Sequence, residues 1–150
     1  AGMLVNGPSA ASLNNSSIAI GRQSAQQASG IAGSNFIGYQ AGFVAENVTN
    51  TNALGYQAAY DSELTDKSDF IGYQAGYSAS GADSSYLGYQ AGRDARAGAT
   101  IGIGYQSAYQ SRGLSHGIAI GRLSLSGSND NRHIISVGFQ SGSCIQNSSD

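Results

Sequence analysis

The sequence predicts an all-β protein whose 150 residues wind into a parallel β-solenoid (β-roll) of eight coils, each 16–17 residues long. The first observation is a repeat, because an aliphatic residue followed by glycine recurs with glycine-to-glycine spacings of 17, 17, 17, 16, 16, 17 and 17 residues. The second is the unit length, which is about half of the 33 residues or more that helical repeats need. The third is residue type, since glycine, serine and β-branched isoleucine disfavour helices. The repeat glycines are Gly21, Gly38, Gly55, Gly72, Gly88, Gly104, Gly121 and Gly138.

Small side chains dominate the composition, with 22 glycines, 21 alanines and 24 serines. Such a chain cannot build a thick apolar core, and a chain of this kind with high net charge would be disordered. The formal net charge is only −2. We therefore expect order to come from the regular stacking of coils.

Stacking places equivalent residues of successive coils about 4.8 Å apart, so each position of the repeat becomes a column. The residue before the glycine is aliphatic in every unit, and we expect this column to lie inside the coil. The residue after it is mostly tyrosine, with Arg22 and Arg122 towards the ends, and the next is glutamine except at Leu123. We expect stacked rings and amide hydrogen bonds from coil to coil. The expected structural ladders consist of Ile20, Ile37, Leu54, Ile71, Leu87, Ile103, Ile120, Val137, Tyr39, Tyr56, Tyr73, Tyr89, Tyr105, Gln40, Gln57, Gln74, Gln90 and Gln106.

The repeat glycine has two structural explanations. It lies either at a bend that needs a positive φ, or at a point where the backbone of another coil comes too close for a β-carbon.

Two outer columns are candidates for surface contacts. Five residues after the glycine runs a second aromatic column in which Arg93 stands between tyrosines, where it can stack on their faces. Eight residues after the glycine runs a column that changes from Glu46 and Glu63 to Arg96 and Arg112. Like charges at coil spacing repel, so we expect this column to face water. The candidate surface-binding residues are Tyr60, Tyr77, Arg93, Tyr109, Arg96 and Arg112.

The repeat also sets the domain organisation. Residues 1–17 do not fit the pattern and are expected to form an N-terminal cap or linker. Residues 18–150 are expected to form the β-solenoid repeat domain.

The repeats resemble those of two known families. The segments 17–21 (Ser-Ile-Ala-Ile-Gly) and 117–121 (Gly-Ile-Ala-Ile-Gly) resemble the head repeats of YadA-like trimeric autotransporter adhesins. The Gly-Tyr-Gln-Ala units beginning at Gly38, Gly55, Gly72 and Gly88 look still more like the repeats of bacteriophage tail fibres. Both resemblances cover residues 18–145 and imply a trimeric, left-handed parallel β-roll that meets a cell surface. The adhesin units are typically shorter than 16 or 17 residues.

The small number of large apolar residues also favours a trimer. Two tyrosine columns with small neighbours leave a long apolar stripe on a single chain, and stripes of this kind mark interfaces. We therefore expect a homotrimer of parallel chains, intertwined or side by side.

Catalysis is not expected. The acidic cluster Asp61, Glu63, Asp66 and Asp69 contains the carboxylates that glycoside cleavage requires, but Lys67 lies among them and a solvated loop is the favoured interpretation. His116 and His133 lie in loops of different coils, so we expect no metal site and no cofactor.

Other function classes are excluded on composition. The chain has no block of lysine or arginine for a nucleic-acid partner and no apolar run of 18 residues for membrane insertion. Cys144 is the only cysteine, so no intrachain disulfide forms.

Together with these features, the resemblance to tail-fibre repeats implies a non-enzymatic, extracellular segment of a bacteriophage tail fibre, a rigid trimeric β-solenoid that attaches to a host receptor. Its expected partners are further copies of itself and a glycan or protein of the host cell surface. Two alternatives stay open: the head domain of a trimeric autotransporter adhesin, and the subunit of an extracellular self-stacking filament.

Overall fold

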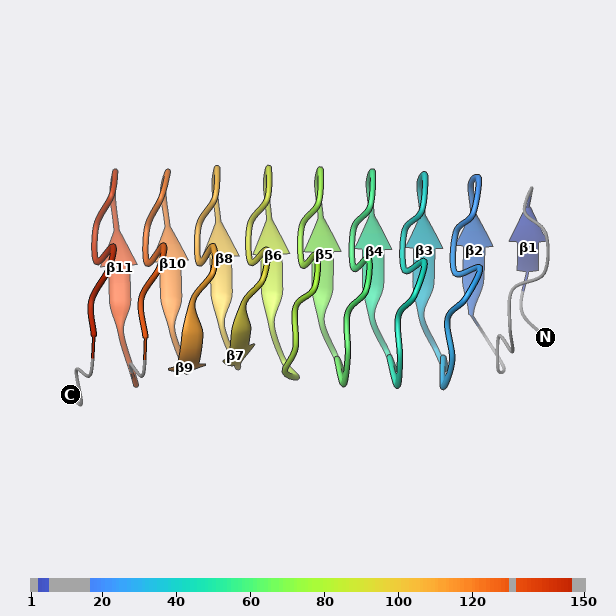
Figure 1. Cartoon of the computed structure of the whole chain (residues 1–150), viewed down its shortest axis with the longest axis horizontal. Helices are drawn as coiled ribbons and strands as arrows, with labels where there is room; N and C mark the ends of the chain where they lie inside the picture. Colours follow the sequence, from blue (N-terminus) through green and yellow to red (C-terminus); the bar gives the residue numbers. More distant parts are fainter. Residues whose placement is uncertain (1–2, 6–16, 130–131, 147–150) are drawn as a thin grey trace.

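The computed structural model of the chain describes residues 3–5, 17–129 and 132–146, and its regular elements are all β-strands (Figure 1). Nine short parallel strands form the main sheet, in the order β1-β2-β3-β4-β5-β6-β8-β10-β11. Among these residues no helix is long and apolar enough to cross a bilayer. The strands are β1 (Met3–Val5), β2 (Ile18–Ile20), β3 (Asn35–Ile37), β4 (Asn52–Leu54), β5 (Asp69–Ile71), β6 (Ser85–Leu87), β8 (Ile101–Ile103), β10 (Ile118–Ile120) and β11 (Ile135–Val137).

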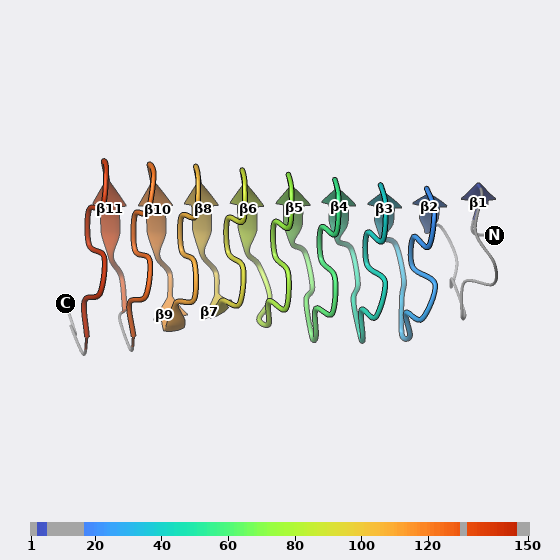
Figure 2. The same cartoon turned by 45° about the horizontal axis from the view of Figure 1, so that its top comes forward.

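A second line of parallel pairing runs along the opposite side of the coil. It contains β7 (Arg96–Gly98) and β9 (Arg112–Ser115), which pair with each other. Isolated parallel bridges extend this line in both directions, from Ser29 and Glu46 at one end to Asn129 and Gln146 at the other. When the molecule is turned, the main-sheet strands still form a single row along a rod (Figure 2).

The predicted parallel β-solenoid is confirmed, with about seven turns rather than eight coils. The register follows the repeat, since Ile20 pairs with Ile37 and Ile37 pairs with Leu54. Eight repeat units supply the eight strands from β2 to β11, and eight strands enclose seven complete turns. Within the expected cap or linker, β1 pairs with β2 as a further parallel strand, and residues 6–16 lie outside the described part of the chain.

The expectation that the aliphatic column lies inside the coil is wrong. Ile20, Ile37, Leu54, Ile71, Leu87, Ile103, Ile120 and Val137 all lie on the outer face of the main sheet, where Ile71 is 41% and Leu87 47% exposed. Successive side chains of a strand point to opposite faces, so only one of two neighbouring columns can face inward. The inward position is the middle residue of each strand, such as Ala19, Phe36 or Ala53, which is fully buried.

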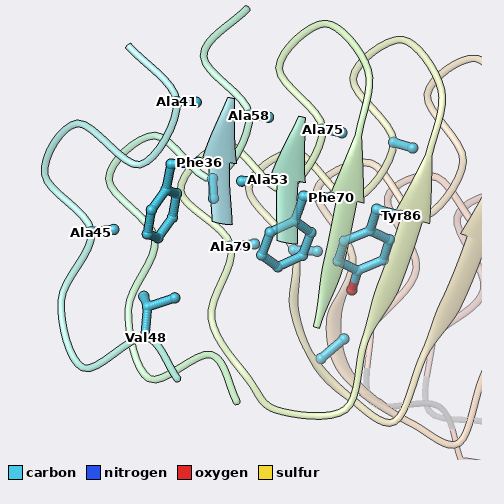
Figure 3. Close-up of a cluster of buried hydrophobic side chains, with 14 of the residues drawn as sticks. Phe36, Ala41, Ala45, Val48, Ala53, Ala58, Phe70, Ala75, Ala79 and Tyr86 are labelled. Atoms are coloured by element: carbon cyan, nitrogen blue, oxygen red, sulfur yellow. The ribbon is translucent and has the colours of Figure 1, made fainter. Parts of the chain in front are cut away.

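The narrow interior is filled by pairing large residues with small ones. Phe36, Phe70 and Tyr86 project inward from their strands (Figure 3). Each ring lies against a glycine on the turn that follows its strand, Gly42, Gly76 and Gly92 respectively, where a β-carbon would overlap with the ring. Where the strand residue is Ala119, the same turn position carries Leu125 and both are fully buried. In these coils one large side chain and one small residue share the interior, whereas the coil with Ala53 and Ala59 carries two small residues at the same positions.

The repeat glycines satisfy both explanations given above. Gly38 has a φ of 140°, and Gly55 and Gly72 have φ values of 138° and 135°. A β-carbon at Gly38 would overlap with the carbonyl oxygen of Gly55 in the next coil, and the same holds for Gly55 against Gly72. This column needs glycine for backbone conformation and for coil spacing.

A buried hydroxyl column lies just before the main-sheet strands and was not expected. The hydroxyl of Ser34 accepts a hydrogen bond from the backbone N–H of Thr51 at 3.1 Å, and that of Ser68 from the N–H of Ser84 at 3.2 Å. These bonds satisfy backbone groups inside the coil that no water can reach.

Candidate binding surface

The aliphatic column and the first tyrosine column together form an exposed surface that we call the apolar stripe. The aliphatic column has a member in every repeat unit, and the tyrosine column has one in the five units from Tyr39 to Tyr105, two residues further on across the repeat glycine. The tyrosines Tyr56, Tyr73, Tyr89 and Tyr105 are each 42–43% exposed, and most of the aliphatic residues beside them are exposed to a similar extent. The stripe consists of Ile20, Ile37, Leu54, Ile71, Leu87, Ile103, Ile120, Val137, Tyr39, Tyr56, Tyr73, Tyr89 and Tyr105.

The tyrosines of the stripe form the predicted ladder. Ring centroids of Tyr56 and Tyr73 are 5.0 Å apart with nearly parallel planes, and the other pairs from Tyr39 to Tyr105 are stacked in the same way. The guanidinium of Arg22 lies over Tyr39, and that of Arg122 lies 5.4 Å from the Tyr105 ring and 5.2 Å from the Phe139 ring. Because each ring face is covered by its neighbour, the ladder presents only ring edges and hydroxyls outward.

The glutamine ladder is also confirmed. The side-chain amide of Gln57 donates to Oε1 of Gln40, that of Gln74 to Gln57, that of Gln90 to Gln74 and that of Gln106 to Gln90, all at 2.8–2.9 Å. These glutamines adopt positive φ angles near 52°, a conformation that costs free energy in a residue with a β-carbon. The amide-to-amide hydrogen bonds add stability to this column.

The second aromatic column behaves as predicted over its first half. Tyr60 stacks between Phe43 and Tyr77, at 5.4 and 4.9 Å, and Arg93 lies 5.1 Å above the Tyr77 ring. Arg93 also donates to Oε1 of Gln74 at 3.0 Å, so it ties this column to the glutamine ladder. Burial raises the pKa of Tyr77. These residues are held by one another, and the faces of Tyr60 are closed to a ligand.

A surface hollow of about 390 Å³ lies beside the second aromatic column. It spans three successive coils and combines carboxylates, hydroxyls, one guanidinium and one exposed leucine. Its lining residues are Asp61, Glu63, Leu64, Ser78, Ala79, Ser80 and Arg96. Of the six candidate surface-binding residues, only Arg96 lines it. Tyr109 and Arg112 lie in the following coil, where Arg112 pairs with Arg96 along the second line of strands and is exposed as expected.

The acidic cluster is divided by the fold. Asp61 and Glu63 line the hollow, whereas Asp66 accepts hydrogen bonds from Thr49 at 2.6 Å and Asn50 at 3.2 Å and pairs with Lys67 at 3.2 Å. These donors lower the pKa of Asp66 to about 2. Asp69 lies on β5 and accepts a hydrogen bond from Asn52 at 2.7 Å. The four carboxylates therefore do not converge on one site.

The two histidines do come together, contrary to the expectation from their separate coils. The rings of His116 and His133 are stacked with centroids 5.2 Å apart, because residues 17 positions apart share a column. The 17-residue spacing between the two histidines, equal to the repeat length, is the signal in the sequence that could have predicted this contact. Within the described residues no group of three histidine, cysteine, aspartate or glutamate side chains is placed to hold a metal ion. Cys144 is exposed and unbridged in this chain.

Comparison with protein-family models, with curated proteins and with solved structures finds no significant match to this chain. Its function is therefore argued from geometry and from the residues themselves.

Proposed function

We propose that this chain is a non-enzymatic, rigid segment of a bacteriophage tail fibre that assembles from three parallel copies and attaches to the surface of a host cell. The observation that carries the proposal is the apolar stripe, which runs along the whole rod from β2 to β11. A row of exposed isoleucine, leucine and tyrosine of this length is covered in a stable protein.

Another copy of the chain is the occupant that fits the stripe best. The stripe repeats once per coil, about every 4.8 Å, over the full length of the rod. A second rod of the same sequence has the same repeat, so side chains can interdigitate along the entire contact. A partner without this period would match it only locally.

Rigidity follows from the ladders. Ring stacking, glutamine bonds and backbone pairing all run along the rod axis, so bending the rod would have to open several of them at once. A stiff segment with repeated surface groups suits a fibre that touches a cell at many weak contacts, because three tethered copies raise the effective concentration of each further contact.

The alternative proposal, the head domain of a trimeric autotransporter adhesin, would use the same apolar stripe as its contact between copies. Gene neighbourhood separates the two, since a tail-fibre gene lies among virion genes and an adhesin carries its own membrane anchor.

The decisive experiment is the solution mass, measured by light scattering on a size-exclusion column across a dilution series. The proposal expects a stable species of about 46 kDa, three times the 15.3 kDa chain. A 15.3 kDa monomer at all concentrations would overturn the trimer, and open-ended growth would favour the filament subunit instead.

A matched pair of variants locates the contact. Leu87→Glu places a charge in the middle of the apolar stripe, and Leu64→Glu places one at an exposed leucine outside it. We expect Leu87→Glu to lose the trimer while keeping its circular dichroism spectrum. We expect Leu64→Glu to keep both the trimer and the spectrum. Retention of the trimer in both variants would show that the stripe is not the contact.

A further inference from the structure

The hollow lies where the middle of three coils carries only small side chains, at residues 78–80, between the longer side chains of Glu63 and Arg96 on the neighbouring coils. Its floor is Ser78, Ala79 and Ser80, while Asp61, Glu63 and Leu64 rise from the preceding coil. Arg96 rises from the following coil. Glu63, Ser80 and Arg96 are successive members of one column, so the two charged residues stand two coil steps, about 10 Å, apart across the serine.

The polar groups of the hollow are largely uncommitted. Neither Glu63 nor Arg96 forms an ion pair with any other residue in the described part of the chain. The hydroxyl of Ser78 lies 3.4 Å from Oδ2 of Asp61, a long and weak hydrogen bond. The hollow thus offers two carboxylate acceptors on one side and a guanidinium donor on the other.

Leu64 adds an apolar edge. Its side chain is 65% exposed and its φ is 53°, so an apolar residue is held outward at a bend beside the carboxylates. Nothing in the folding of the coil requires leucine here, because the equivalent position of the preceding coil is the exposed Asn47.

We infer that this hollow binds one pyranose unit of a polysaccharide through adjacent hydroxyl groups. A sugar hydroxyl both donates and accepts, so neighbouring hydroxyls can donate to Asp61 and Glu63 while another group accepts from Arg96. The apolar face of the ring packs on Leu64. The volume lies at the lower end of the range for small-molecule sites, about 300–1,000 Å³.

A metal ion in the hollow and a sugar stacked on the neighbouring tyrosines both fit less well. A bare metal ion would face the positive charge of Arg96 with only two carboxylates to hold it. Sugar stacking on the neighbouring tyrosines is closed, because Tyr60 is covered on both faces and Arg93 lies over Tyr77. The inference deepens the proposed attachment role and rests on it, since a polysaccharide is the ligand that a cell surface presents in many copies.

The test is an NMR titration of the full chain with oligosaccharides of glucose, galactose, mannose and N-acetylglucosamine. We expect one of them to shift the backbone amides of Leu64, Ser78 and Ser80 with a dissociation constant of about 1 mM, a weak affinity that suits an open site. Arg96→Ala and Glu63→Gln should each weaken binding about tenfold, as expected for loss of a hydrogen bond to a charged group. Ser80→Gln should abolish sugar binding, because the longer side chain would fill the floor of the hollow. The fold should tolerate this change, since Glu63, a side chain of the same size, occupies the same column one coil earlier.

The chain supplies matched controls in the same column. Arg112→Ala and Glu46→Gln change the same residue types one coil away, outside the hollow, and should leave the dissociation constant unchanged. Absence of shifts at about tenfold the expected dissociation constant, or an equal loss in Arg112→Ala and Arg96→Ala, would overturn the inference. The mass measurement is independent of the sugar titration. A 46 kDa species that does not bind sugar would reject this site and leave the proposed trimer intact. A monomer that binds sugar would reject the trimer and support the site.

Discussion

The ring of Phe70 occupies the space that a β-carbon at Gly76 would need. The equivalent turn position in the preceding coil is Ala59, which has a φ of 51° and lies opposite the small Ala53. Alanine therefore tolerates the backbone of this turn, and the ring is what excludes it from position 76.

Gly76→Ala should accordingly lower the free energy of unfolding by about 2–3 kcal/mol, because the ring must leave its rotamer. Phe70→Ala alone should cost about 3–5 kcal/mol by opening a cavity. The double variant recreates the Ala53–Ala59 pair and should cost no more than Phe70→Ala. Denaturant midpoints at one fixed protein concentration measure this, and strictly additive losses would contradict the pairing.

Gly55→Ala tests the coil spacing. Its β-carbon would overlap with the carbonyl of Gly72 in addition to facing a φ of 138°, so we expect a loss above about 4 kcal/mol or failure to fold. Gly138→Ala is the matched control, since Gly138 has a similar φ of 129° but its β-carbon would meet only Ser141 at 3.9 Å. Thermal unfolding of both variants should show a much smaller effect at position 138. Equal effects would mean that backbone conformation alone requires glycine.

Gln74→Leu tests the glutamine ladder. Gln74 donates to Gln57, accepts from Gln90 and accepts from Arg93, so leucine leaves three partners unsatisfied and should cost about 1–3 kcal/mol. Leucine itself fits the column, because Leu123 has a positive φ of 60°, close to the 52° of Gln74. Gln140→Leu, at an exposed position next to Leu123, should be nearly neutral in the same urea unfolding experiment. A neutral Gln74→Leu would show that backbone pairing alone orders this column.

Asp66 gives a prediction for pH. Its pKa of about 2 lies below the ordinary value of 3.8, chiefly because Thr49 donates to its carboxylate, with a smaller effect of Asn50. A depressed carboxyl pKa favours the folded state above the ordinary value, and this contribution is lost as pH falls from about 4 through about 2. Thr49→Val should raise the pKa of Asp66 more than Asn50→Ala does, as followed by the NMR shift of the carboxyl carbon. The reverse order would contradict the contacts assigned here.

The candidate site was only partly predictable. Arg96 could be named because it stood out in a charged column, and Asp61 and Glu63 could be named as part of an acidic cluster. Ser78 and Ser80 could not, since a serine in a chain with 24 of them carries no signal until its larger neighbours are placed around it. Tyr60 and Tyr77 were named for binding, yet their ring faces pack on neighbours in the column.

The sequence by itself determined the architecture, because a 16–17-residue period forces equivalent residues into columns, and columns of tyrosine, glutamine and glycine have only a few ways to stack. The tertiary structure alone decided which face of the sheet points inward. Both Phe70 and Ile71 are apolar, and alternation along a strand permits either to be buried. An aromatic ring fits at this inward position only where the residue on the facing turn is small. Gly76 meets that requirement for Phe70, so Phe70 points inward and Ile71 is left on the outer surface.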